Sequence, residues 1–339
     1  MTKGVRLYQV DAFTTRRFSG NPAAVCILED EISDNIMQQI AAEMNLSETA
    51  FVRRLPSAAE GEYSLRWFTP AMEVPLCGHA TVATAAALLE GEGVQCSELR
   101  FQTVHCGVLT VTRESGLYHL SVPLLAPGHP HSSVAQPCDA ISKVIMGSLP
   151  GAHCLYTGHC GKSKYVFLAL EGLEAGQLES MAAPTAELRS LPGCDGIIGV
   201  IVSCAGHDTK TRKVFMALEG LTREQFEQWD PPIAQLKGTL SSIDDIRSVI
   251  VSCAGGDGQP ELLVRFFAPW AGIDEDPVTG SAYAVAGPWW ASKLGKSSFA
   301  ARQCSKRGGD LHITVSEADG RVDVAGGAVV ISEGRLFLD

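Results

Sequence analysis

A short pattern of strand, proline, loop and glycine-started helix occurs twice in this chain, with the two copies 199 residues apart (265 − 66). Residues 66–70 (RWFTP) resemble residues 265–269 (RFFAP), and each segment is followed by a loop and an Ala-rich stretch that begins at Gly78 or at Gly280. Repeated sequence indicates repeated structure. We therefore predict two lobes of the same design related by a pseudo-twofold axis. Chance recurrence of common turn residues is the alternative.

The remaining local patterns predict an α+β fold with many strands and a few buried helices. Strand-like segments are short, rich in β-branched or aromatic residues and bounded by turn residues. They occupy residues 5–10, 23–28, 63–68, 108–112 and 119–122. Residues 33–44 have apolar positions at helical spacing. Residues 80–89 are rich in Ala and Leu, and Gly91 is the predicted C-terminal stop of that helix.

A second repeat, nearly literal, lies in the middle of the chain. Residues 166–173 (VFLALEGL) match residues 214–221 (VFMALEGL), and residues 200–206 (VIVSCAG) recur unchanged as 249–255. Two copies are too few for a solenoid, which needs at least three. We interpret the repeat as a segment duplication or as one exon included twice. One copy is expected to complete a sheet, and the other to add a strand pair at an edge or to pack poorly.

These patterns set the predicted domain boundaries. We expect an N-terminal lobe at residues 1–125, with the last strand at about 328–339 as a candidate addition. The C-terminal lobe is expected at residues 126–327. It includes the tandem copies, which lie at about 164–208 and 212–257.

Charge and composition exclude several classes of function. The formal net charge of −11 disfavours nucleic acid and anionic membranes as partners, but leaves a small anionic substrate open. No run of eighteen apolar residues and no apolar leader is present, so we expect a cytoplasmic protein with reduced thiols. The pairs His153-Cys154 and His159-Cys160 lack a second ligand cluster, so no metal is predicted.

The two glycine-started helices are candidate anion sites. Gly78-His79 and Gly280-Ser281 would each present free backbone N–H groups and the positive end of a helix dipole. If both helix ends face one cleft, they suit a substrate that carries a carboxylate. Ordinary capped helices, with Ser281 as an N-cap, are the alternative.

Two carboxylates are candidates for proton transfer or substrate binding. Glu48 lies between a predicted helix and an apolar strand, and a carboxyl group in a partly apolar site can take and return a proton. Asp276 follows two other acids before a turn and could accept a hydrogen bond from a substrate. A solvated loop is the alternative for each residue. Neither a Gly-rich nucleotide loop nor a nucleophile elbow is present, so no cofactor is predicted.

Taken together, these segments resemble the PhzF-like, or phenazine biosynthesis-like, family and most closely its animal members. The resemblance extends from about residue 7 to about residue 335 and is weakest at 124–260, where the tandem copy lies. Subtracting one copy (339 − 48 = 291) leaves a length typical of the family. The segments that carry the resemblance are 11–14 (DAFT), 20–25 (GNPAAV), 44–51 (MNLSETAF), 65–81 (LRWFTPAMEVPLCGHAT), 267–282 (FAPWAGIDEDPVTGSA) and 303–311 (QCSKRGGDL).

The resemblance implies the diaminopimelate-epimerase-like fold, in which each of two lobes is a curved sheet around a central helix. It implies that Glu48 is the acid/base residue and that His79, Asp276 and Ser281 hold the polar groups of the substrate. It also implies chemistry without cofactor or metal, a homodimer, and an interaction with a WD-repeat protein.

One position departs from the family pattern. Family members commonly have His two residues after the Ser of the second motif, where this chain has Tyr283, which is larger and titrates far higher. We expect Tyr283 to contact the substrate together with Cys77, Gly78 and Gly280.

The sequence therefore predicts a cofactor-independent isomerase of a small carboxylate. A catalytically vestigial binding or scaffold protein is the alternative. A cysteine-dependent racemase is a third reading, but Thr279 stands where the partner of Cys77 would be needed.

Overall fold

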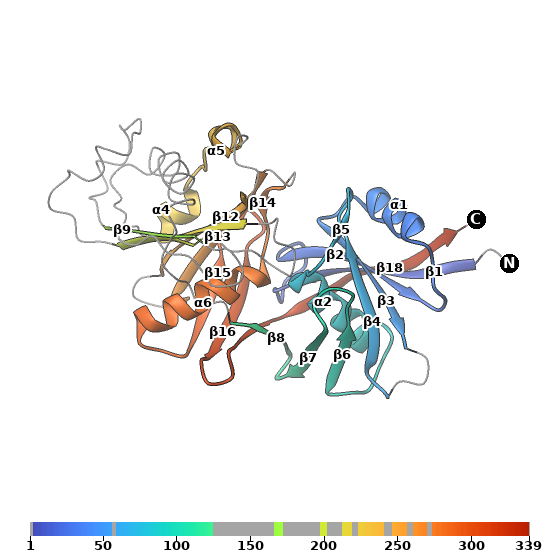
Figure 1. Cartoon of the computed structure of the whole chain (residues 1–339). Coiled ribbons are helices and arrows are strands. Elements are labelled where there is room, and N and C mark those ends of the chain that lie inside the picture. The colour runs from blue at the N-terminus through green and yellow to red at the C-terminus, as the bar shows by residue number, and fades with distance from the viewer. Residues whose placement is uncertain are drawn as a thin grey trace. The chain divides into compact units, whose positions relative to one another are not determined.

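The computed structural model describes residues 3–55, 59–124, 166–171, 197–201, 212–218, 223–240, 246–255, 260–269 and 273–338. The chain forms two compact units (Figure 1). Unit 1 comprises Met1–Pro123, Pro277–Ser281 and Lys306–Asp339, and unit 2 comprises Leu124–Asp276 and Ala282–Ser305.

Unit 1 is a strongly curved mixed sheet. Its strands follow one another in the order β18-β1-β2-β3-β4-β6-β7-β8-β17-β16, with β5 paired to the end of β4. The pairs β2–β3 and β4–β6 are parallel, and the other pairs are antiparallel. The strands are β1 (Lys3–Ala12), β2 (Asn21–Leu28), β3 (Glu48–Arg54), β4 (Glu62–Phe68), β5 (Glu73–Val74), β6 (Glu98–Gln102), β7 (Val108–Glu114), β8 (Leu117–Pro123), β16 (Gly309–Ser316), β17 (Arg321–Gly326) and β18 (Ala328–Leu338).

Helix α2 (Gly78–Ala86) is the core of unit 1, and all nine of its residues are buried. Small side chains let strands from both ends of the sheet pack against it, among them β1, β2, β8 and β18. The hydroxyls of its buried threonines are hydrogen-bonded within the helix. Thr81 donates to the carbonyl of Cys77 at 2.6 Å, and Thr84 donates to the carbonyl of Ala80 at 2.7 Å. The close packing of α2 therefore holds the residues at its N-terminus in fixed positions.

Helix α1 (Asp34–Met44) covers the other face of the sheet through Met37, Ile40 and Ala41. The hydroxyl of Ser33 accepts a hydrogen bond from the backbone N–H of Ile36 and so caps the helix. At its C-terminus, Asn45 adopts the left-handed conformation with φ of 49° and turns the chain toward β3.

All five predicted strands and both predicted helices of the first half are confirmed. The helix ends at Gly91, as predicted, but not through a left-handed turn at that residue. The chain passes from α2 into a π-helical turn, η1 (Ala87–Gly91), and Gly91 is not among the residues with positive φ. A methyl group at Gly91 would lie 2.5 Å from Cε1 of Tyr8, so close packing against that ring, and not a left-handed turn, requires glycine here.

Unit 2 is built around β13 (Leu262–Ala268), in which every residue is buried. Trp290 of α6 donates to the hydroxyl of Ser252 on β12 at 2.9 Å, which ties these two elements together. Helix α6 continues through Pro288 without a break. The other elements of unit 2 are β9 (Val166–Glu171), β10 (Ile197–Ile201), β11 (Arg212–Leu218), α4 (Arg223–Gln228), α5 (Ile233–Leu240), β12 (Ile246–Ala254), β14 (Ile273–Asp276), α6 (Gly280–Leu294, which begins in unit 1) and β15 (Ser298–Gln303).

The repeated strand–proline pattern forms the same local structure in both units. In unit 1, β4 is antiparallel to β3 and β5 and parallel to β6. In unit 2, β13 is antiparallel to β12 and β14 and parallel to β15. The repeated arginine makes the same bidentate pair in each: Arg66 with Glu73 at 2.7 and 2.8 Å, and Arg265 with Glu275 at 2.7 and 3.0 Å. The pseudo-twofold relation between the lobes stays a prediction.

The unit boundaries differ from the predicted lobes in two internal segments, of which the shorter, Pro277–Ser281, lies in unit 1. Residues 306–327, which we placed in the C-terminal lobe, lie in unit 1. The cause is the pairing of β17 with β8, which runs from Arg321↔Pro123 to Gly326↔Tyr118. A sequence pattern that identifies strands does not identify their partners, so this long-range pairing could not be predicted.

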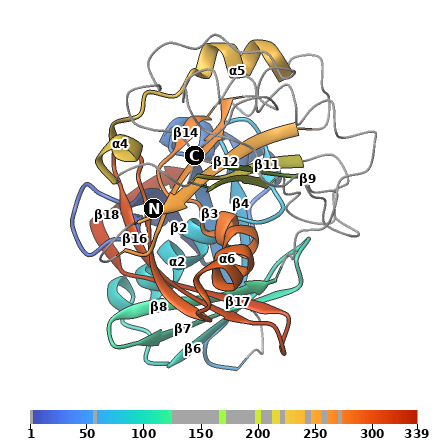
Figure 2. The ribbon, with the colours of Figure 1, turned by 90° about the vertical axis from the view of Figure 1, so that its left-hand side faces the viewer.

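Strands from the two tandem copies lie in the same sheet of unit 2 (Figure 2). Equivalent positions pair in parallel, with Val166 opposite Val214 and Phe167 opposite Phe215. Most of residues 164–208, and both His-Cys pairs, lie outside the described residues. The origin of the repeat therefore stays an interpretation. Among the described helices, none is long and apolar enough to cross a membrane.

Candidate active site

Glu48 and His79 approach each other in unit 1. Glu48 is the first residue of β3, and His79 is the second residue of α2. His79 Nε2 lies 3.3 Å from Glu48 Oε2, and the side chains are 5% and 14% exposed. Residues alternate between the two faces of a strand, and Phe51 faces α1, so Glu48 begins the opposite face of β3, which faces α2. A carboxylate and an imidazole are thus held together in a largely dry site.

Asn21, the first residue of β2, links the segments of this site. Its side-chain amide donates to the carbonyl of Val278 at 2.8 Å and lies 3.0 Å from His79 Nδ1. Its carbonyl oxygen lies 3.3 Å from the hydroxyl of Ser47. Asn21 is fully buried, so this one side chain joins β2, the turn before Glu48, helix α2 and the segment before α6.

These contacts fix the tautomer of His79. The carbonyl of Val278 can only accept, so the amide nitrogen of Asn21 must face both that carbonyl and His79 Nδ1. Nδ1 is then the acceptor, and the ring proton is on Nε2, which lies 3.3 Å from the hydroxyl of Ser47. The Ser47 hydroxyl in turn donates a hydrogen bond to the amide oxygen of Asn21, which closes a hydrogen-bonded ring of three side chains. The Nε2–H bond therefore faces Ser47 and Glu48.

Burial keeps this imidazole uncharged. Desolvation lowers the pKa of His79 from 6.5 to about 3. A neutral ring with one N–H is also what the Asn21 contact requires, because a doubly protonated ring would direct a second N–H at a donor. Hydrogen bonding and desolvation thus favour the same protonation state.

Cys77 and the two helix starts complete the site. Cys77 is the N-cap of α2, is buried, and places Sγ 3.4 Å from His79 Nδ1. A methyl group added at Gly78 would lie 3.5 Å from the Cα of Gly280, so the starts of α2 and α6 are adjacent. Ser281, the second residue of α6, is partly exposed beside them. It is inside the helix and not an N-cap, because α6 begins at Gly280.

Glu48, Cys77 and His79 also form a possible set of metal ligands, since their ligand atoms lie within 4.8 Å of one another. The hydrogen bonds of His79 oppose such binding. A metal on Nδ1 would meet the N–H of Asn21, and a metal on Nε2 would need the proton moved to Nδ1, against the same donor. A stable metal site here would require Asn21 to leave its bond to Val278.

Asp276 and Tyr283 belong to unit 2. Asp276 ends β14, is 7% exposed, and its backbone carbonyl accepts a 2.8 Å bond from the side chain of Gln303. Tyr283 is fully buried in α6. That these residues share a site with Glu48 stays a prediction.

Sequence reasoning missed the roles of Asn21 and Ser47. Both lie in segments that carry the family resemblance, and Ser47 directly precedes Glu48. The available signal was an Asn directly before a proline at the start of a predicted strand. Arg307 fixes the loop before Asn21, because it donates to the carbonyl of Gly20 and to the carboxylate of Asp11, each at 2.8 Å.

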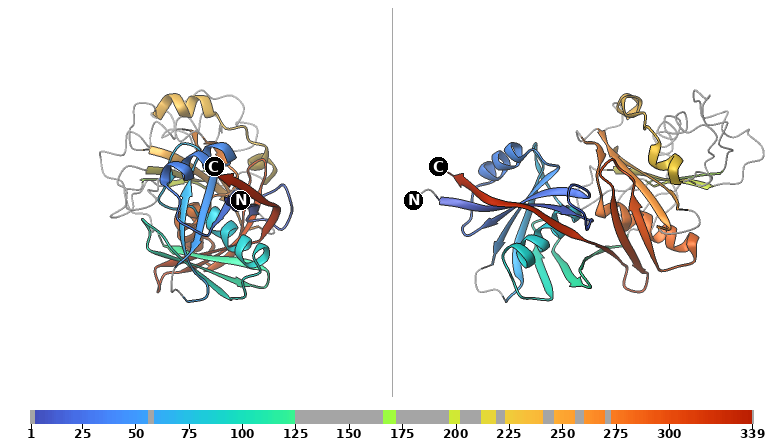
Figure 3. Two further views of the ribbon diagram at one scale, coloured as in Figure 1. Left: turned by 90° about the vertical axis from the view of Figure 1, so that its right-hand side faces the viewer. Right: turned by 180° about the vertical axis from the view of Figure 1, so that it is seen from behind.

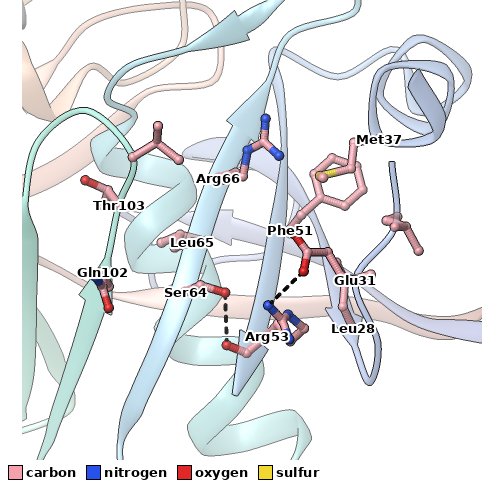
Figure 4. A pocket seen from close by; sticks show the side chains of 12 residues that line it. Leu28, Glu31, Met37, Phe51, Arg53, Ser64, Leu65, Arg66, Gln102 and Thr103 are labelled. Atoms are coloured by element: carbon pink, nitrogen blue, oxygen red, sulfur yellow. Dashed lines mark hydrogen bonds and ion pairs between the residues drawn. The ribbon is translucent and has the colours of Figure 1, made fainter. Parts of the chain in front are cut away.

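A separate hollow of about 330 Å³ lies on the opposite face of β3 from Glu48 (Figure 4). One wall carries Met37 and Phe51, and the other carries Ser64 and Gln102. Its lining includes neither Glu48 nor His79, so this hollow and the predicted site are distinct.

Comparison with known proteins adds independent information. The chain matches the family model for phenazine biosynthesis-like protein, PhzC-PhzF, over residues 10–210 and 201–334. The human phenazine biosynthesis-like domain-containing protein is 36% identical over 335 residues, covering 97% of this chain and 98% of that protein. An uncharacterized isomerase of Pseudomonas aeruginosa is 36% identical over 335 residues, covering 98% of this chain and 99% of that protein. A PhzF-family phenazine biosynthesis protein from Enterococcus faecalis has a TM-score of 0.70 at 29% identity, covering 99% of this chain and 100% of that one.

The fold and these relatives define the class: an enzyme of the isomerase type with an α+β, diaminopimelate-epimerase-like fold, as predicted. More particularly, the chain belongs to the PhzC-PhzF, or phenazine biosynthesis-like, family.

Proposed function

We propose that this chain is a cofactor-independent isomerase that moves a proton within a small carboxylate substrate, with Glu48 as base and then as acid. The observation that carries the proposal is the position of the Glu48 carboxylate, 3.3 Å from Nε2 of a buried and neutral imidazole. The isomerase relatives support the class of reaction.

The neutrality of His79 matters for this chemistry. Glu48 must hold a proton between removal from one carbon and delivery to another, so its charged and protonated forms must both be accessible. An imidazolium 3.3 Å away would strongly favour the charged carboxylate, whereas a neutral N–H favours it much less. Substrate and product have the same composition, so the cycle needs no oxidant, reductant or co-reactant.

The adjacent helix starts support a substrate with a carboxylate. Gly78 and Gly280 let the two helix starts pack against each other, since a methyl group on either would contact the Cα of the other at 3.5 or 3.6 Å, and the backbone N–H groups of both first turns are therefore close together. A carboxylate there would be stabilised by both helix dipoles. In this proposal, Ser281, Asp276 and Tyr283 supply further polar contacts to the substrate.

A two-thiol racemase has less support. Cys77 precedes Gly78, but Thr279 precedes Gly280, so the second helix start lacks the matching thiol. The Cys77 thiol also lies next to His79 Nδ1, which already faces the amide of Asn21.

The proposal is tested by incubating the protein with a panel of small cyclic and amino carboxylates. We expect a product of unchanged mass and altered NMR spectrum from one class of substrate, and no product with Glu48→Gln. A product of different mass would refute isomerisation. Turnover of no panel member by a folded protein would favour the binding or scaffold alternative.

A further inference from the structure

The hollow of about 330 Å³ on the α1 side of β3 is built into the fold of unit 1. Figure 3 shows α1 and α2 on opposite sides of the strands of this unit, and the hollow lies between Met37 of α1 and Gln102 at the end of β6. The pairing of β4 with β6 ends at Ser64↔Gln102, so the sheet is open beyond it. The turn after β6 is held by the hydroxyl of Thr103, which donates to the carbonyl of Gly107 at 2.8 Å. The hollow is therefore preformed, as small-molecule sites usually are.

The floor of the hollow is apolar. Leu28, Met37 and Phe51 form it, and all three belong to the buried cluster that α1 makes with the sheet. Val104 also lines the hollow, and 65% of this large apolar side chain is exposed. A ligand with an apolar body would cover Val104 and rest against the floor, and burial of apolar surface is favourable. The floor therefore favours a ligand with a hydrocarbon part.

The charged groups of the hollow favour an anion over a cation. Among the charged residues that line it, Arg53 and Arg66 are positive and Glu31 is negative. Arg66 is already engaged, because it donates to Glu73 and to Asp34, each at 2.7 Å. Its charge is balanced there, which leaves Arg53 as the cation that can contact a ligand.

The ion pair of Arg53 is weak. Among the described residues, the guanidinium pairs with Glu31 alone, at 3.5 Å, and the side chain of Glu31 is 81% exposed (Figure 4). A long and exposed ion pair of this kind contributes little to stability. The side chain of Arg53 is only 25% exposed, so its guanidinium is held at the hollow. A ligand carboxylate could therefore replace that of Glu31 and form the bidentate pair that arginine favours.

We propose that this hollow is a second binding site, for a small apolar monocarboxylate whose carboxylate pairs with Arg53 in place of Glu31 and whose hydrocarbon part covers Val104. An apolar cation would meet the guanidinium groups of Arg53 and Arg66, and an uncharged ligand would gain no ion pair. Glu48 lies on the opposite face of β3 and is not part of the lining, so binding here is independent of the proposed isomerase activity.

The test titrates the full chain with octanoate and follows the methyl group of Met37 by carbon-13 NMR. Met37 lines the hollow, and Met37→Leu identifies its signal among the seven methionines. We expect a saturable shift of this signal with a dissociation constant of about 1 mM or lower. Octan-1-ol and octylamine have the same chain without the carboxylate, and each should bind at least about fivefold more weakly.

Two variants should change octanoate binding in opposite directions. Arg53→Gln should weaken it about fivefold to tenfold, because the cation that holds the carboxylate is lost. Glu31→Gln should tighten it about twofold to fivefold, because the competing carboxylate is lost. Arg17→Gln and Glu43→Gln are the matched controls, since they remove the same charges from exposed side chains outside the lining, and both should leave the dissociation constant unchanged.

Circular dichroism verifies that all variants fold. An unmoved Met37 signal at octanoate concentrations up to about 10 mM would overturn the proposal. So would octylamine that binds as tightly as octanoate, or a dissociation constant that neither Arg53→Gln nor Glu31→Gln changes.

Discussion

Replacing Asn21 by Asp tests the hydrogen-bond ring most sharply. Aspartate has the same shape, but an ionised carboxylate only accepts, so it can donate neither to Val278 nor to His79 Nδ1. The 2.8 Å bond to Val278 is lost at a fully buried position, whereas the contact with His79 Nδ1 is kept once the ring proton moves to Nδ1. At about 1–3 kcal/mol for the unsatisfied carbonyl of Val278, the free energy of unfolding should fall by about 1–3 kcal/mol. Chemical denaturation measures this change.

The same substitution should move the proton of His79. With a carboxylate opposite Nδ1, that nitrogen becomes the donor, and the ring either loses the proton on Nε2 or becomes doubly protonated. Nitrogen-15 NMR distinguishes these states from the wild-type Nε2–H tautomer, and His79→Gln identifies the signal among nine histidines. Ser47→Ala is the control, because it leaves the bond from Asn21 to Nδ1 intact. A wild-type ring protonated on Nδ1, or an unchanged tautomer in Asn21→Asp, would refute the reasoning.

Three further predictions follow from buried contacts. Because the pKa of His79 is depressed, only the unfolded state binds a proton at this residue between pH 6.5 and about 3. The free energy of unfolding should therefore fall by about 1.4 kcal/mol for each pH unit below 6.5. Denaturation curves of His79→Gln should lack this contribution to the slope. Arg307→Ala leaves the Asp11 carboxylate, which is 2% exposed, without its partner, and should lower the free energy of unfolding by about 3 kcal/mol, whereas a change below about 0.5 kcal/mol would contradict this account. Gly91→Ala should lower the free energy of unfolding by about 1–3 kcal/mol, because the new methyl group clashes with the ring of Tyr8. In a Tyr8→Ala background, which lacks that ring, Gly91→Ala should not lower the free energy of unfolding further.

Local elements were predictable because their signals are local. The period of apolar residues specifies α1, and β-branched runs between turns specify the strands. The recurrence of Arg66 as Arg265 indicated repeated local structure, and the matching ion pairs to Glu73 and Glu275 confirm that local repeat.

Features that depend on contacts distant in sequence were not predictable. Nothing local shows that β17 pairs with β8, or that Val278 lies beside Asn21, 257 residues away. Candidate residues could be named from motifs, but the ring of bonds that sets the state of His79 depends on segments that only the fold brings together.

The central claim is that Glu48 carries the proton, and deuterium incorporation from heavy water tests it most directly. Small carboxylates are incubated with wild type, with Glu48→Gln, and with Glu43→Gln as the matched control at an exposed glutamate. We predict deuterium at a substrate carbon with wild type and Glu43→Gln, and none with Glu48→Gln although that variant remains folded. Incorporation by Glu48→Gln at the wild-type rate would contradict the account.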